Sequence, residues 1–171
     1  MITASFVRDL FAHMEWADAR MWAAMPSVTP PDDFLRNTLV HLHAVQRSFF
    51  LIWTGGEPVQ AFRQPSEFAA LADVRAWAQP HYLEAHAFLE TVTDAQLAEP
   101  IVMPWAALIA QELGHEPAET TLGDTCFQVA SHTTHHRGQI NTRLRAIGAE
   151  PPSVDYIIWM WHGRPAPQWP S

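Results

Sequence analysis

The sequence predicts an all-α protein, a four-helix bundle with a short additional C-terminal helix. Apolar residues recur every three or four positions along much of the chain, which is the periodicity of amphipathic helices. Prolines and glycines interrupt the pattern where helices are expected to begin and end. No internal repeat, low-complexity tract or linker divides the 171 residues, so we expect a single domain over residues 1–171.

The first two helices are bounded by clear start and stop signals. The first has an apolar stripe formed by Phe6, Leu10, Met14, Ala17 and Met21. The segment PSVTPPDD ends it, and Pro31 with the following aspartates suits a new start. We therefore predict a second helix from Asp33 to Trp53, which ends at Gly55 and Gly56.

The middle of the chain is less regular. A third helical region is predicted from about Ser66 to Thr91, with a kink or break near Gln79 because Pro80 removes a backbone donor. Three prolines punctuate residues 94–119, where the segment PIVMPW suits a short extended piece.

A fourth helix is predicted to begin at Thr121, which has the spacing of a capping box with Asp124. It should continue to about Ile147 and stop at Gly148. The segment AEPPSVDYIIWMW then suggests a short final helix that the prolines start.

Composition excludes several classes of partner. The formal net charge of −8 argues against nucleic acid and anionic membranes, which both require a basic patch. No stretch approaches ~20 uninterrupted apolar residues, and the charged N-terminal segment does not resemble a signal peptide. Cys126 is the single cysteine, which excludes an internal disulfide and suits a reducing compartment. We therefore expect a cytoplasmic protein.

The segment SHTTHHRGQI, residues 131–140, holds three histidines within five positions. On a helix, His132 and His136 lie about 40° apart on one face, and Gln139 falls near that face on the next turn. His135 lies about 100° from His136, so one helix does not aim all three at one centre. The pattern fits a metal site, a buried polar network or a solvated surface run.

Two histidines four residues apart hold a metal only with help, because a catalytic zinc site typically has three protein ligands and one open position. His41 and His43 of the second helix are candidates, but they lie about 200° apart, so both cannot face the interior of the bundle. Periodicity alone favours His41 only slightly. The remaining candidates are the other histidines at His13, His81, His86 and His162.

Neighbouring residues have both functional and structural interpretations. Gly138 within a helix costs ~1 kcal/mol relative to alanine, so a close helix crossing or room for a ligand would explain it. Arg137 suits an anionic substrate or cofactor, or a surface ion pair. Gln139 suits a hydrogen bond to a ligand histidine, or the rim of the site.

Cys126 is expected in the core. Tryptophans are also expected to build the core, namely Trp16, Trp53, Trp105, Trp159 and Trp161. One or two of them would also suit the wall of a substrate pocket or the interface of a homodimer.

These residues resemble the DinB superfamily of bacterial metal-binding four-helix proteins. The family pattern H-x-x-x-H-R-G-Q is matched by HTTHHRGQ, residues 132–139, through His132, His136, Arg137, Gly138 and Gln139. The segments FAHMEWADARMWAAM, NTLVHLHAVQRSFFLIWTGG and LRAIGAEPPSVDYIIWMW are similar to the family's opening, second and closing segments. The resemblance thus covers nearly the whole chain.

The resemblance implies His41, His132 and His136 as metal ligands that converge on a partly open point inside the bundle. Gln46 departs from the acidic residue that family members often have there, which leaves His43 as an alternative to His41. Three imidazoles favour zinc or nickel. The family also implies a low-molecular-weight thiol as a further cofactor. The predicted function is a metal-dependent thiol S-transferase, isomerase or hydrolase that acts on a small-molecule substrate. The alternative is a non-catalytic metal-binding stress-response protein.

Overall fold

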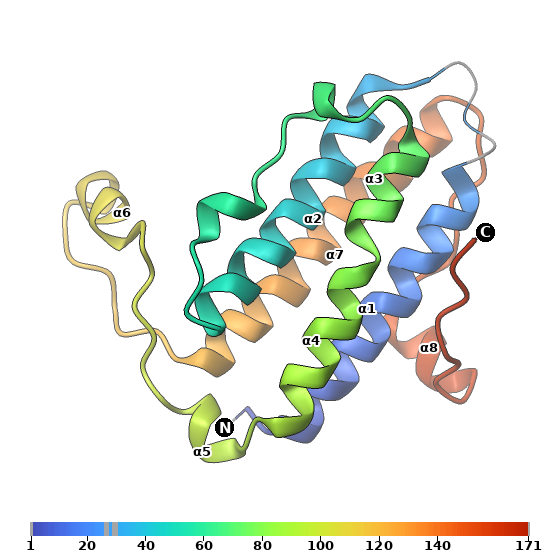
Figure 1. Ribbon diagram of the computed structural model, residues 1–171. Coiled ribbons are helices and arrows are strands. Elements are labelled where there is room, and N and C mark those ends of the chain that lie inside the picture. Colours follow the sequence, from blue (N-terminus) through green and yellow to red (C-terminus); the bar gives the residue numbers. More distant parts are fainter. Residues whose placement is uncertain (1, 26–27, 29–30, 171) are drawn as a thin grey trace.

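A computed structural model describes residues 2–25, 28 and 31–170. The all-helical class is confirmed, because these residues contain no β-strand and only one antiparallel bridge, between Pro100 and Thr121. Figure 1 shows α1, α2, α7 and the consecutive helices α3 and α4 lying alongside one another. Their bounds are α1 Ala4–Ala24, α2 Asp33–Trp53, α3 Leu71–Ala78, α4 Pro80–Thr91 and α7 Leu122–Ala146. The four-helix bundle is our interpretation of this arrangement.

Local capping explains why the ends of the long helices agree with the prediction. The Asp32 carboxylate accepts a hydrogen bond from the Leu35 N–H at 2.9 Å and starts α2. Thr121 and Asp124 form the predicted capping box at the start of α7. Gly55 and Gly148 follow α2 and α7 with φ angles of 75° and 80°, which an L-residue with a side chain rarely adopts.

The third helical region begins later than predicted. Residues Pro65–Glu67 form only a short 3₁₀ turn, and α3 starts at Leu71. The reason is a second start signal, because the Asp73 carboxylate accepts the Ala70 N–H at 2.9 Å. The predicted break is confirmed, since Pro80 is the first residue of α4 and Gln79 joins it to α3.

The irregular segment between α4 and α7 holds two short helices, α5 Asp94–Leu97 and α6 Ala106–Leu113. In Figure 1, α6 projects away from the long helices. The short final helix is α8, Tyr156–Trp161, which begins after Asp155 rather than at the prolines. No helix of the described chain is both long and apolar enough to span a membrane.

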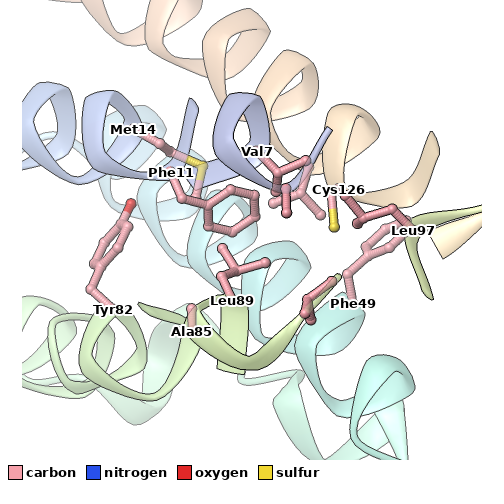
Figure 2. Close-up of a cluster of buried hydrophobic side chains, with 12 residues drawn as sticks. Val7, Phe11, Met14, Phe49, Tyr82, Ala85, Leu89, Leu97 and Cys126 are labelled. Atoms are coloured by element: carbon pink, nitrogen blue, oxygen red, sulfur yellow. The ribbon is translucent and has the colours of Figure 1, made fainter. Parts of the chain in front are cut away.

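The apolar core fills the space between the long helices. Figure 2 shows Phe11, Leu89 and Cys126 within one cluster of buried side chains. Cys126 is fully buried, which confirms the prediction of a core thiol, and this burial raises the pKa of the thiol to about 12.

The expectation that the tryptophans build the core was wrong for Trp161, which is 76% exposed, while Trp159 on the same short helix is buried. A six-residue helix covers the core with one face only.

Helix α7 packs against α1 along one side and against α2 along another, and these are its two most extensive contacts with other helices. We call each line of contact a seam. The polar residues of α7 that the sequence singles out therefore fall into two groups. One group borders α2, and the other borders α1.

Candidate metal centre

Three imidazoles from two helices meet at the seam between α2 and α7. One nitrogen each of His41, His132 and His136 lies within 4.8 Å of the other two. The Nε2 atoms of His41 and His132 are 3.3 Å apart. The ring centroid of His136 lies 4.6 Å from that of His41 and 4.4 Å from that of His132. The structure thus brings together the three residues that the sequence selects.

The location of this histidine cluster differs from the expectation. His41 is exposed, and His132 and His136 are half-buried. The three rings therefore meet at the edge of the helical assembly rather than inside it. The expectation of an interior site was wrong because His41 lies on the outer side of α2, where the seam with α7 is open to solvent.

His43 is the residue of α2 that faces the interior, and it is only 1% exposed. Its Nδ1–H donates to Gln46 Oε1 at 2.8 Å, and its Nε2 accepts the indole N–H of Trp22 at 3.1 Å. Both ring nitrogens of His43 are therefore engaged in the core. His41, not His43, is the α2 residue of the cluster.

The interior carries a connected polar network instead of a metal ligand set. The amide of Gln46 donates to Asp18 Oδ2 at 3.0 Å and to Thr133 Oγ1 at 3.2 Å. The Tyr82 hydroxyl donates to the same carboxylate, and burial raises the pKa of that phenol. A glutamine thus occupies the position where the family often has an acid, and it links His43 to Asp18.

Arg137 belongs to this network. It is 2% exposed, and its guanidinium lies 3.0 Å from Asp18 Oδ1. It also donates to the Met14 carbonyl at 3.3 Å and to Thr134 Oγ1 at 3.0 Å. The expectation of a surface ion pair was therefore wrong, because Arg137 forms a buried ion pair with Asp18. Its predicted role in binding a cofactor stays a prediction.

Gln139 bridges two histidines of α7. Its Oε1 accepts the Nδ1–H of His136 at 2.7 Å, and its Nε2 donates to His135 Nε2 at 3.1 Å. A neutral imidazole carries one proton, so this bond leaves Nε2 of His136 as the free lone pair. Side chains that fix the tautomer of a ligand histidine in this way are typical of metal sites.

Two of the clustered histidines, His41 and His132, are held in the neutral form that metal binding requires. Burial, with the nearby rings of His136, His41 and His135, lowers the pKa of His132 to about 4. Burial and His136 also lower the pKa of His41. Both imidazoles therefore offer lone pairs at neutral pH without first losing a proton.

One pair of donors, from His41 and His132, has the spacing expected around a tetrahedral transition-metal ion. Two nitrogens bound at 2.0–2.1 Å to such an ion would lie about 3.3–3.4 Å apart, and the Nε2 atoms of His41 and His132 are separated by 3.3 Å. Hard ions such as magnesium and calcium prefer oxygen ligands, which this cluster does not offer. The residues present thus suit a borderline ion.

Two hollows adjoin the cluster. One of about 270 Å³ is lined by His41 and His136 together with Phe34 and Thr38, and one of about 830 Å³ by His135, Gly138 and Arg143. Phe34 and Gln139 border both. Sequence reasoning missed Phe34 because an exposed phenylalanine in the first turn of a helix carries no signal of its own.

The other histidines named by the sequence lie outside the cluster. His13 donates to the Val154 carbonyl, and His86 lies 2.8 Å from a Glu15 oxygen. His81 is buried with neither ring nitrogen hydrogen-bonded in the described structure. His162 caps the end of α8. None of them belongs to a second metal-type cluster within the described residues.

The fold and the cluster define an all-helical protein with three histidines that could hold a metal ion. The family model of the DinB family matches residues 3–168. The chain therefore belongs to the DinB family, as its residues suggest. No curated protein matches the chain.

Proposed function

We propose that this protein is a metal-dependent enzyme that acts on a small molecule, as a thiol S-transferase or isomerase or as a hydrolase. His41, His132 and His136 would hold one zinc or nickel ion. The observation that carries the proposal is the meeting of three imidazoles from α2 and α7 beside an open hollow. Three protein ligands and an open fourth position are the arrangement of catalytic rather than structural zinc sites.

A bound ion of this kind would polarise a carbonyl group or lower the pKa of a water or thiol. The chain's own residues do the rest. Gln139 holds His136 with Nε2 directed away from its Nδ1 hydrogen bond. Phe34 offers an apolar wall to the larger hollow, which Arg143 also lines while it is paired with Asp32 at 2.7 Å. A substrate or thiol with an apolar part suits the wall that Phe34 forms.

The second candidate function, a non-catalytic metal-binding stress-response protein, has one observation in its favour. Neither of the two hollows is lined by an aspartate or glutamate, so no carboxylate is placed there as a general acid or base. His135 is the remaining titratable side chain in the walls, apart from the cluster and Arg143. If the protein only senses or stores metal, no acid or base is needed.

A turnover screen separates the two functions. Zinc- and nickel-loaded protein is incubated with a panel of low-molecular-weight thiols paired with electrophiles, and with simple esters and amides. We expect turnover that disappears in His132→Ala and His136→Ala. Exposed His115→Ala is the matched control, because it removes a histidine far from the cluster.

Metal-dependent melting without any turnover would favour the non-catalytic function, since a ligand that binds only the folded state raises its stability. Turnover that survives both histidine substitutions would contradict the proposed centre.

A further inference from the structure

A third cavity lies at the seam between α7 and α1, where it is also bordered by residues 154–156 at the start of α8. Its volume is about 460 Å³, within the size range of small-molecule sites. None of the three clustered histidines lines it. Thr134 does, and at about 100° per residue it lies roughly 160° around α7 from both His132 and His136. The cavity therefore lies on a different side of α7 from the clustered histidines, although Gly138 also borders the larger hollow beside them.

One wall carries a buried histidine with a free acceptor. His13 is 7% exposed, and its Nε2–H donates to the Val154 carbonyl at 2.8 Å. Burial is the largest cause of the lowered pKa of His13, so the ring is neutral and Nδ1 keeps its lone pair. No described side chain donates to that nitrogen. A ring nitrogen with a lone pair, on a residue that lines a cavity, can accept a hydrogen bond from an occupant.

Two further acceptors border the same cavity. The Asp155 carboxylate at its rim has neither an ion pair nor a side-chain hydrogen bond with the described residues. Asn141 Oδ1 is buried and also lacks a donor. The one cation in the wall, Arg137, is already paired with Asp18 at 3.0 Å. The acceptors without a described partner are thus one carboxylate, Asp155, and two neutral groups, His13 Nδ1 and Asn141 Oδ1.

The apolar part of the lining is formed by Leu10 and Met14 from α1, and by Phe127 and Ala130 from α7. Three hydroxyl-bearing residues also line the cavity: Ser131, Thr134 and Tyr156. Gly138 completes the wall, and an added Cβ there would meet nothing within 4 Å. A close helix crossing therefore does not explain this glycine. Open space beside it is the remaining explanation.

We propose that this α1–α7 cavity is a binding site for small organic cations, in which a protonated primary amine meets Asp155 and His13 and a short apolar or aromatic body lies against Met14 and Phe127. The net charge of −8 favours the approach of such cations. The site goes beyond the proposed function and does not depend on a metal ion.

The test uses three probes of one size and shape: benzylamine, benzyl alcohol and benzoate. Each is titrated into metal-stripped full-length protein and followed by calorimetry and by ligand-observed NMR. We expect saturable binding of the amine, weaker binding of the alcohol and none of benzoate. Asp155→Asn should weaken amine binding roughly tenfold or more, because a hydrogen bond to a charged group is lost. Exposed Glu112→Gln is the matched control, which removes the same charge elsewhere.

Two more variants locate the binding. Ser131→Trp changes an exposed residue of the cavity wall and should abolish amine binding by filling the space, while circular dichroism verifies the fold. His132→Ala removes the metal centre and should leave amine binding unchanged, which separates this proposal from the proposed function. Equal binding of amine and benzoate, no saturable amine binding, or binding indifferent to both Asp155→Asn and Ser131→Trp would overturn it.

Discussion

Gln139 accepts a hydrogen bond from Nδ1 of His136 at 2.7 Å, one turn further along α7. The same amide donates to His135, which fixes its orientation so that Oε1 faces the clustered histidine. Gln139 thus favours the tautomer of His136 in which Nδ1 carries the proton and Nε2 is available to an ion.

Replacing Gln139 by leucine should weaken metal binding about 10- to 100-fold, the usual cost of losing a hydrogen bond to a ligand histidine. Competition with a chromogenic chelator measures this affinity. Gln128→Leu, at an exposed position of the same helix, is the control and should leave the affinity unchanged. Equal affinities for the two variants would show that Gln139 does not position His136.

The buried pair of Asp18 and Arg137 should be important for folding. Arg137→Ala leaves a carboxylate buried without its partner, and we expect a loss of about 3–5 kcal/mol in the free energy of unfolding. Arg36→Ala removes a partly exposed arginine from its ion pair with Asp33, whose side chain is largely exposed, and should cost at most about 1 kcal/mol. Urea denaturation measures both. Similar losses for the two variants would contradict a special role of the buried pair.

His81 should make the protein less stable in acid. Burial lowers its pKa to about 3 from an ordinary value of 6.5, so the unfolded chain binds a proton between these pH values that the folded chain does not. Stability is therefore full above pH 6.5 and falls as the pH drops towards 3, by up to about 1.4 kcal/mol per pH unit.

His81→Phe should reduce this slope, since it removes one such proton, and should raise the stability at low pH. Urea denaturation between neutral pH and pH 4 measures it, with exposed His162→Gln as the matched variant. An unchanged slope in His81→Phe would mean that the buried ring is protonated in the folded state.

Gly138→Ala should stabilise the protein by about 0.5–1 kcal/mol, because it lowers the entropy of the unfolded chain and the new methyl meets nothing within 4 Å. Gly123→Ala on the same helix is the contrasting variant. Its Cβ would lie 3.0 Å from the Leu97 carbonyl, so it should destabilise. Thermal melting distinguishes them, and a lower melting temperature for Gly138→Ala would contradict the open space assigned to this position.

Features set by neighbouring residues could be predicted from the sequence. The caps at Asp32 and Thr121 and the break at Pro80 each depend on contacts within a few positions. The start of α3 was misplaced because two start signals compete there, and the one at Asp73 determines the helix. Local chemistry thus accounts for most helix ends.

The choice between His41 and His43 depends on packing between distant segments. His43 shares the buried face of α2 with Leu39 and Gln46. Because glutamine is usually a surface residue, the sequence pattern does not indicate that this face of the helix is the buried one. Likewise, only the fold shows that Arg137 meets Asp18 from α1. The homodimer stays a prediction.

The central claim is that His41, His132 and His136 hold one transition-metal ion. Elemental analysis of protein purified from metal-replete cells tests it most directly. We expect about one ion per chain in the wild type and close to none in His132→Ala and His136→Ala, with His43→Gln retaining the metal if it folds. A metal-free wild type, or histidine variants that hold as much metal as the wild type, would contradict the account.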